Sequence, residues 1–513
     1  MESSVSVLKF GGTSVGSGER IRRVAHIIAR HSTEPGETFP IVVVSAMSGI
    51  TDQLLRIAHY SSTGQYAACE QELGALKRRH LEAAEKAVHQ HEGQCTLQHD
   101  LETAFAALEQ DVAALQQEAK DAQSVSLLTS AVAAWGERFS VLLVAAAARD
   151  IGLAAAAVRE EVIITGYPQD EPPEATGRGE VKLTVAHADP LPEETRVRVH
   201  ALVHPLVERG IIPIVAGFIG RTASAPDSSA PGFVTTLGRN GSDYSAAVIG
   251  AALDCSEVCI YSDVDGVLTA DPRVVANTLL LPRLSYAEAA RLSWFGAKVL
   301  HPRTLIPLAH RNIPVRVRNT FRPHTRGTVV GPEGKQHSAA AAITARRHLA
   351  LITVESTDMF GAPENAGQVF ALAARAGAAP VAICSSSGQH LSFVVEEQAA
   401  DSVVALLQHD MGAWRVLSRR NLAACACIGS GFSVDPMSPA RAVTALARER
   451  IPVITQGASE LAIILIVEDR DSERAVRCLH RDLVAPVIPL VRHSAHEKRH
   501  EALQELLISP AEA

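Results

Sequence analysis

The chain has 513 residues, a formal net charge of −8 and a hydrophobic fraction of 47%, with few aromatic residues. This charge excludes long-range attraction to nucleic acid or to an anionic membrane, and the apolar content suffices for roughly three domains. No apolar leader precedes Lys9 and the run Val141 to Ala148 is too short to span a bilayer, so we expect a soluble cytoplasmic protein.

The first predicted element is a buried strand, indicated by the apolar run Val5 to Leu8. The segment Lys9 to Ser14 follows it and contains Gly11, Gly12 and Thr13 ahead of a helix expected near Glu19. Glycines let backbone N–H groups approach an anion, and hydroxyl groups and a helix N-terminus add donors, so this segment suits phosphate. The lysine precedes the glycines, unlike the P-loop, and a plain strand-to-helix turn is the alternative.

A second apolar run, Ile41 to Val44, ends in the small-residue loop Ser45 to Thr51, which leads into a helix. Two such loops at neighbouring strand ends predict one cleft. Residues from about 66 to 120 are predicted to form a long helical hairpin, interpreted as an insertion outside the catalytic core. Another helix is expected from about Ser124 to Arg149, and in it Glu137 is either a surface residue or a ligand anchor.

Strand patterns return at Ile211 to Val215 and at Val258 to Tyr261, with helical patterns between the strands. This alternation predicts an α/β fold with a mostly parallel sheet. The Pro-rich and Gly-rich residues 167–192 predict a loop that closes over a site. The stretch from Gly331 to Ala342 is interpreted as the linker that ends the first domain.

Two C-terminal stretches resemble each other at an offset of 72 positions. Cys384 to Ser387 leads to an apolar run that ends at Val395, and Gln456 to Ser459 leads to one that ends at Val467. Each copy has a helix before it and one after it. This pattern predicts a tandem pair of small αβ modules suited to regulation.

The most specific motif runs from Thr235 to Ala247, where a glycine-flanked loop leads into a helix. Ser242 and Asp243 lie near the helix N-terminus, and capping would account for both. Capping does not account for Arg239, which stands between two glycines and suits a carboxylate or a phosphate. The motif therefore favours a substrate loop over a capped turn.

A second acidic loop, Ser262 to Leu268 followed by Asp271 to Arg273, comes after a strand. Its spacing lacks the EF-hand positions, and the eight cysteines form no CxxC pair, so no metal site is predicted and free thiols are expected. Nucleotide contacts together with turn chemistry account better for the loop. Further on, Lys298 is either a solvated lysine or a phosphate ligand, and His301 is interpreted as structural.

Taken together, five segments resemble the aspartate kinases of the amino-acid kinase superfamily, and the C-terminal repeat resembles their paired ACT domains. The segments are Lys9 to Ser14, Ser45 to Thr51, Gly238 to Ala246, Ser262 to Arg273 and Phe295 to Pro302. The resemblance covers nearly all of residues 5–490, and the set of motifs is more specific than any one of them. It implies an α/β amino-acid kinase fold followed by two ferredoxin-like βαββαβ ACT domains. The implied boundaries are a kinase domain at 1–330 with a helical insertion at about 64–120, a linker at 331–342, a first ACT domain at 343–420 completed by about 484–492, a second at 421–483, and a flexible tail at 493–513.

The resemblance implies ATP-dependent phosphorylation of the β-carboxylate of L-aspartate to 4-phospho-L-aspartate, the first step toward lysine, threonine and methionine. Lys9 would stabilise the transferring phosphoryl group and Asp243 would hold Lys9. A β-carboxylate is already ionised at pH 7, so no general base is required, and Mg²⁺ would bridge the ATP phosphates without a dedicated protein cage. The implied ATP contacts are Lys9, Gly11, Gly12, Thr13, Ser14, Ser262, Asp263, Leu268, Arg273 and Lys298.

For aspartate, the resemblance implies that Glu137 takes the α-ammonium group and Arg239 the α-carboxylate. The other implied contacts are Ser45, Thr51 and Ser242. Family precedent puts effector pockets at interfaces between ACT modules, with lysine favoured over threonine as the effector. The candidate effector contacts are Met359, Gly361 and Ser385. We expect a homodimer or homotetramer assembled through the ACT domains, and a monofunctional chain without a homoserine dehydrogenase.

Several positions depart from the family pattern. Leu268 stands where a tyrosine near the nucleotide is usual, and Trp135 stands where a smaller or basic residue is common. Glu364 replaces a glycine in the first ACT loop, and the second ACT loop, Gly429 to Asp435, departs further. Two alternatives stay open, a catalytically silent amino-acid sensor and another amino-acid kinase. The presence of Lys9 argues against the first, and the ACT pair argues against the second.

Overall fold

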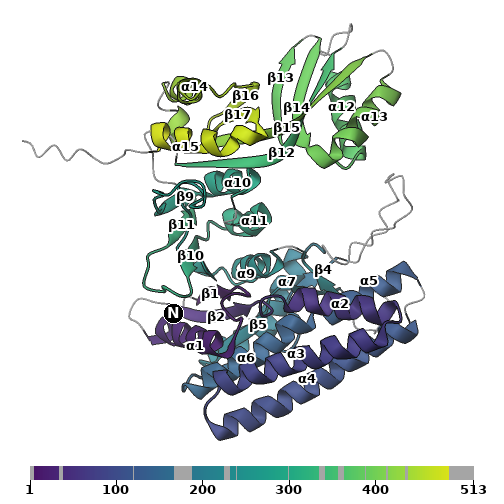
Figure 1. Cartoon of the computed structure of the whole chain (residues 1–513). Coiled ribbons are helices and arrows are strands. Elements are labelled where there is room, and N and C mark those ends of the chain that lie inside the picture. Colours follow the sequence, from purple (N-terminus) through teal and green to yellow (C-terminus); the bar gives the residue numbers. More distant parts are fainter. Residues whose placement is uncertain are drawn as a thin grey trace, which may run out of the picture.

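The computed structural model describes residues 5–33, 38–118, 121–166, 188–223, 232–238, 240–297, 300–333, 341–355, 363–387, 389–411, 414–433 and 437–484. The N-terminal part, purple to teal in Figure 1, is an α/β domain, and the C-terminal part, green to yellow, is an antiparallel sheet with helices. The predicted order, a mostly parallel α/β fold followed by a pair of small modules, is confirmed.

An eight-stranded sheet lies at the centre of the N-terminal domain, in the order β3-β5-β2-β1-β8-β10-β11-β9. Neighbouring strands pair in parallel except β10 and β11, which are antiparallel. The strands are β1 (Val5–Phe10), β2 (Phe39–Val44), β3 (Ala155–Ala157), β5 (Ile212–Ala216), β8 (Glu257–Ser262), β9 (Arg283–Ser285), β10 (Val315–Asn319) and β11 (Thr328–Gly331). A small second sheet contains β4 (Ile164–Thr165), β6 (Ile219–Thr222) and β7 (Val234–Thr236).

Helices cover both faces of the large sheet, and alternate residues of β1 therefore belong to two different cores. Leu8 and Phe10 pack beneath α1 and α6, whereas Val7 packs beneath α9. Burial on both faces explains why the central strands are continuous apolar runs. The helices of this domain are α1 (Gly18–Thr33), α2 (Ile50–Ser62), α3 (Tyr66–Ala87), α4 (His91–Glu118), α5 (Ala122–Ala133), α6 (Trp135–Asp150), α7 (Pro192–Leu202), α8 (His204–Glu208), α9 (Gly241–Ala252), α10 (Tyr286–Trp294) and α11 (Pro302–His310).

The helical hairpin, α3 and α4, packs against α1, α2 and α6, and its apolar side chains share the core that contains Phe10. Its turn falls at residues 88–90. Downstream, the single helix expected up to Arg149 is divided at Ala134 into α5 and α6. The stretch Ser124–Asp150 is long and apolar enough to cross a membrane, but 83% of its most apolar window is buried inside the protein, as in a core helix.

The C-terminal domain is one six-stranded sheet in the order β13-β14-β12-β15-β17-β16. β14 and β17 occupy positions that differ by the predicted 72 residues, and β12 and β15 pair antiparallel along their length, which joins the two modules. β15 begins at Arg415, ahead of residue 421, where the second ACT domain was expected to begin. The first module contains β12 (Ala342–Glu355), α12 (Pro363–Arg375), β13 (Ala382–Ser387), β14 (His390–Glu396) and α13 (Ala400–Asp410); the second contains β15 (Arg415–Ile428), α14 (Ser438–Arg448), β16 (Thr455–Ser459), β17 (Ala462–Glu468) and α15 (Ser472–Leu483).

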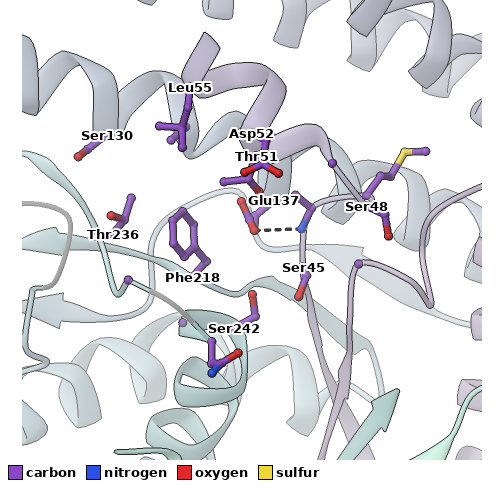
Figure 2. A pocket seen from close by; sticks show the side chains of 18 of the residues that line it. Ser45, Ser48, Thr51, Asp52, Leu55, Ser130, Glu137, Phe218, Thr236 and Ser242 are labelled. Atoms are coloured by element: carbon purple, nitrogen blue, oxygen red, sulfur yellow. Dashed lines mark hydrogen bonds between the residues drawn. The ribbon is translucent and has the colours of Figure 1, made fainter. Parts of the chain in front are cut away.

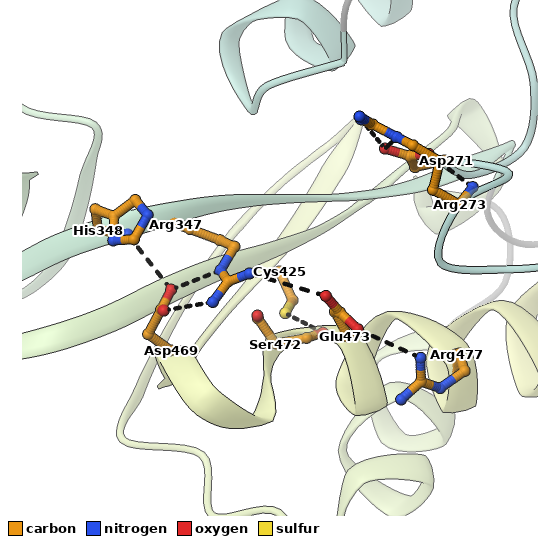
Figure 3. Close-up of polar contacts among 9 residues, drawn as sticks. All are labelled: Asp271, Arg273, Arg347, His348, Cys425, Asp469, Ser472, Glu473 and Arg477. Atoms are coloured by element: carbon orange, nitrogen blue, oxygen red, sulfur yellow. Dashed lines mark hydrogen bonds and ion pairs between the residues drawn. The ribbon is translucent and has the colours of Figure 1, made fainter.

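Ion pairs join the modules on either side of the β12–β15 ladder. Arg347 of β12 reaches across to Asp469 of the second module at 2.8 Å (Figure 3). Arg420, at the equivalent place on β15, pairs with Asp401 of the first module. The residues that follow the arginines, His348 and Asn421, both have a φ of 58°, so the irregularity in the two strands is itself repeated.

We expect Gly18→Ala to destabilise the protein by about 1–3 kcal/mol, because a side chain there would overpack the contact between α1 and α3. An added Cβ would lie 2.5 Å from Lys86 Cβ and closer still to the carbonyl oxygen of Ala83. Urea unfolding measures the change. Gly74→Ala in α3 is the matched control, because its nearest neighbour, an Arg78 nitrogen, would be 3.6 Å away. That substitution should stabilise by about 0.5–1 kcal/mol, and equal effects of the two would contradict the docking of the hairpin.

Candidate active site

A cavity of about 690 Å³ opens at the carboxyl ends of β1, β2 and β5. Its size suits a small polar substrate, and this edge of a parallel sheet is where α/β folds bind ligands. The loops after β1 and β2, the first turns of α2 and α9, and side chains of α5 and α6 line it. Figure 2 shows Glu137 and Thr51 close together at the loop after β2, with Phe218, Ser242 and Thr236 on other parts of the wall.

Lys9 and Asp243 form an ion pair inside this cavity, with 2.5 Å between Lys9 Nζ and Asp243 Oδ1. Lys9 is the penultimate residue of β1 and is only 8% exposed, and Asp243 lies in the first turn of α9. A lysine ammonium group has three N–H donors, so donors remain for a ligand. A Cβ at Gly11 would lie 3.4 Å from Lys9 Nζ. A side chain at this position would therefore lie in contact with the ammonium group.

The loop Gly11 to Ser14 approaches the loop after β2 closely. A Cβ at Gly12 would lie 2.8 Å from the carbonyl oxygen of Ala46, so only glycine fits. The backbone N–H groups of Gly12 and Thr13 have no partner among the described residues, which leaves them available to an anion. Ser14 differs, because its N–H donates to Gly11 O at 2.9 Å and its buried hydroxyl bonds to Thr320 Oγ1 at 2.6 Å. Ser14 therefore fixes the end of the loop through its own hydrogen bonds.

Two helices begin at the cavity without a side-chain cap. The residues that precede α2 and α9, Gly49 and Asn240, have φ values of 79° and 57°. The N–H groups of Thr51 and Asp52 in the first turn of α2 have no partner in the part of the chain that the structure describes. Helix N-termini attract anions. Because Asn240 holds the cap position, capping does not explain Ser242 or Asp243.

Glu137 is a buried carboxyl group on the cavity wall. It is 2% exposed, and its Oε1 accepts a hydrogen bond from Ala46 N at 3.0 Å (Figure 2). Its Oε2 is buried and has no hydrogen-bond partner among the described residues. Burial raises the pKa of Glu137 to about 8, although the Ala46 N–H and the Lys9 charge act in the opposite direction. Glu137 is therefore no surface residue, and its free oxygen suits an incoming cation.

Of the residues predicted for the nucleotide, Lys9 and Gly12 line the cavity, whereas Ser262, Asp263, Leu268 and Arg273 follow β8 and do not line it. β8 pairs with β1, and Ser262 at its end donates to Asp263 Oδ1 at 3.0 Å. Leu268 forms a bridge with Leu280. The side chain of Arg273 is 79% exposed and pairs with Asp271 at 2.6 Å. These residues belong to one loop, which lies beside the loop Gly11 to Ser14.

Five predicted residues have no described side chain. Arg239, Lys298, Met359 and Gly361 lie outside the described residues, and of Ser385 only its place in β13 is described. The other predicted aspartate contacts, Ser45, Thr51, Glu137 and Ser242, all line the cavity.

Sequence reasoning missed other parts of the wall, above all Phe218, with Asp52, Leu55 and Ser130, and it included Thr236 and Asn240 only as members of the substrate-loop motif. Phe218 has a φ of 65°, rare for a bulky residue, and its N–H donates to Ser245 Oγ at 2.8 Å. The available signal was the Gly217-Phe218 step at a strand end. An aromatic residue there is more often part of the core, so the signal was weak.

Known proteins resemble the chain along most of its length. Residues 4–319 match the amino acid kinase family, and residues 426–483 match an ACT domain. The bifunctional aspartokinase/homoserine dehydrogenase 2 of Arabidopsis thaliana is 32% identical over 93% of this chain and 50% of its own length, so the chain spans about half the length of such relatives. Aspartokinase 3 of Arabidopsis thaliana is 30% identical over 92% of this chain and 80% of its own length.

Solved structures agree with this assignment. E. coli aspartokinase III, in complex with aspartate and ADP, superposes with a TM-score of 0.73 at 27% identity, covering 94% of this chain and 100% of that one. The aspartate kinase of Clostridium acetobutylicum, at 20% identity and a TM-score of 0.68 over 94% and 100%, shares the fold. The chain belongs to the amino acid kinase family and, within it, to the aspartokinases.

Proposed function

We propose that this protein transfers the γ-phosphoryl group of ATP to the β-carboxylate of L-aspartate. The observation that carries the proposal is one cavity that holds the Lys9–Asp243 ion pair and the buried Glu137 with a free oxygen. The related E. coli aspartokinase III was crystallised with aspartate and ADP, which supports the same substrates here. No observation favours a silent sensor or a kinase with another acceptor.

Aspartate offers one ammonium group and two carboxylates, and the cavity offers complementary groups. The free Oε2 of Glu137 accepts the ammonium group. The uncapped first turn of α2 and the hydroxyls of Thr51 and Ser242 bind carboxylate oxygens. Arg239 remains our proposal for the α-carboxylate partner. A bound aspartate then has its β-carboxylate directed toward Lys9.

Phosphoryl transfer to an ionised carboxylate needs alignment and charge neutralisation more than proton transfer. Lys9 neutralises charge on the transferring group, and Asp243 holds its ammonium in place. The N–H groups of Gly12 and Thr13 bind phosphate oxygens, whereas Ser14 supports the loop from behind. Ser262, Asp263, Leu268, Arg273 and Lys298 contact the nucleotide from the β8 side.

Mg²⁺ bound to the ATP phosphates would supply further charge neutralisation. Among the described residues, no group of three metal-ligating side chains forms a cage for it. We propose that the cation is held through substrate oxygens and waters.

We also propose feedback control through the ACT pair, with lysine favoured over threonine as the effector and Met359, Gly361 and Ser385 as candidate contacts. The E. coli aspartokinase III structure with lysine and aspartate supports this preference. We further propose that the protein forms a homodimer or a homotetramer and that it is cytoplasmic.

A coupled ADP-release assay with MgATP and either L-aspartate or L-glutamate tests the function. Wild-type protein should turn over aspartate and not glutamate. Lys9→Met should lower kcat by at least about 10³-fold, because an uncompensated phosphoryl charge raises the barrier. Lys77→Met, which changes a lysine outside the cavity, is the matched control. Turnover of aspartate by Lys9→Met near the wild-type rate would refute the role of Lys9.

Asp243→Asn tests the positioning of that lysine separately. The substitution keeps the shape and removes the charge that pairs with Lys9 Nζ at 2.5 Å. We expect kcat to fall by about 10- to 100-fold with the KM for aspartate nearly unchanged, because the effect concerns the transition state. A rise in KM alone would assign Asp243 to substrate binding.

Binding of aspartate should release about one proton at pH 7, because Glu137 must ionise to pair with the ammonium group. With a pKa of about 8 in the free protein, Glu137 is mainly protonated at pH 7, so affinity should rise with pH between about 6 and 8. Calorimetry in two buffers of different ionisation enthalpy measures the proton count. Glu137→Gln should abolish the release, and wild-type binding without a buffer dependence would contradict this account of Glu137.

A further inference from the structure

Two segments of the kinase domain that carry proposed nucleotide contacts dock on the C-terminal domain. The first is the loop after β8, which contains Leu268 and Arg273. The second is the end of α10 with the residues up to Ala297, directly before Lys298. Both meet the first half of β12, residues Ala342 to Arg346.

Thr269 anchors the first segment, and all of its polar groups are used. Its carbonyl oxygen accepts a hydrogen bond from Ile343 N at 2.8 Å, and its N–H donates to Leu279 O at 2.9 Å. Its hydroxyl accepts from Leu279 N at 3.0 Å and bonds to His480 Nε2 of α15 at 2.8 Å. Thr269 and His480 are 3% and 4% exposed. Because water is excluded, losing either partner leaves an unsatisfied polar group.

Apolar contacts hold the same loop on the second module. Ala270 and Val275 are buried in the core that contains Ile343 and Cys425. Between them, Asp271 binds both the backbone N–H and the guanidinium group of Arg273 (Figure 3). The position of Arg273 therefore depends on a loop that is anchored on the C-terminal domain.

The second segment is tied to the next residues of β12. Thr344 Oγ1 donates to the carbonyl oxygen of Phe295 at 3.2 Å, and Arg346 Nη1 donates to that of Trp294 at 2.9 Å. The Arg346 guanidinium also lies 5.5 Å from the centre of the Trp294 ring. Gly296 has a φ of 98°, and an added Cβ would lie 3.3 Å from Ala345 O. The chain thus runs against β12 just before Lys298.

We propose that Thr269 and Thr344 are positioning residues for the nucleotide. Through these two residues, the first half of β12 fixes the position of both nucleotide segments, and His480 supports Thr269. The inference rests on the proposed function and deepens it. It makes the regulatory domain a structural support of the ATP site. The aspartate cavity is built from other elements, namely β1, β7, α2, α5, α6, α9 and the loops after β1, β2 and β5, so its affinity should not depend on β12.

Thr269→Val and Thr344→Val test the proposal, because valine keeps the shape and removes the hydroxyl. Each should raise the KM for MgATP and the Kd for MgADP about five-fold, as expected for one lost hydrogen bond, and leave the KM for aspartate within about two-fold. Thr269→Ser and Thr344→Ser should restore nucleotide affinity, because serine retains the hydroxyl.

Thr353→Val is the matched control on the same strand. Thr353 lies in the second half of β12, and its hydroxyl bonds to Ser392 Oγ of the first module at 3.3 Å. The Thr353→Val variant should change neither the KM for MgATP nor the Kd for MgADP. Circular dichroism and melting temperature show whether each variant is folded, and Thr344→Val, at a half-buried site, carries the test if Thr269→Val fails to fold.

Unchanged nucleotide constants in folded variants would overturn the inference, as would equal rises in both KM values or an equal effect of Thr353→Val. Wild-type protein that binds MgADP but does not phosphorylate aspartate would refute the proposed function alone, because the Kd for MgADP still compares the variants. Wild-type protein that binds no MgADP would refute both.

Discussion

The ion pair between Lys9 and Asp243 is the interaction on which the rest of the site depends. It joins the end of β1 to the first turn of α9, and so it sets the distance between the central strand and the helix that crosses it. Burying a lone ammonium group costs several kcal/mol, and a paired carboxylate offsets that cost. The pair therefore permits a positive charge at the point where two glycine-containing loops leave room for phosphate. Gly12 serves the same end, because a Cβ there would collide with the Ala46 carbonyl oxygen, and a Cβ at Gly11 would contact Lys9 Nζ.

The charged groups of the cavity together indicate which kind of ligand it binds. Lys9 and Asp243 compensate each other, and burial keeps Glu137 mainly protonated at pH 7, so these three side chains together carry little net charge. The uncapped N-termini of α2 and α9 add partial positive charge without a mobile side chain. Such a site selects a ligand that brings its own cation and anions in the right order. An α-amino acid with a second carboxylate meets that requirement.

Sequence patterns predicted the features that depend on local order along the chain. Apolar runs that end in Lys9 and in Ser45 predicted neighbouring strand ends and one cleft, and the spacing of 72 predicted the paired modules. Features that depend on distant segments were not predictable. The burial of Glu137 requires the loop at Ala46, the inward role of Ser14 requires Thr320, and the docking of Thr269 requires His480. In each of these contacts the two partners are more than fifty residues apart in the sequence, so no periodic pattern indicates the contact.

The identity of the acyl phosphate formed tests the central claim most directly. MgATP, L-aspartate and hydroxylamine would be incubated with the wild-type protein, and the trapped hydroxamate would be identified by mass spectrometry and compared with authentic standards. The account predicts aspartate β-hydroxamate in amounts that match the ADP released, and none with glutamate. Absence of a hydroxamate with aspartate from folded protein, or formation of the α-hydroxamate, would contradict it.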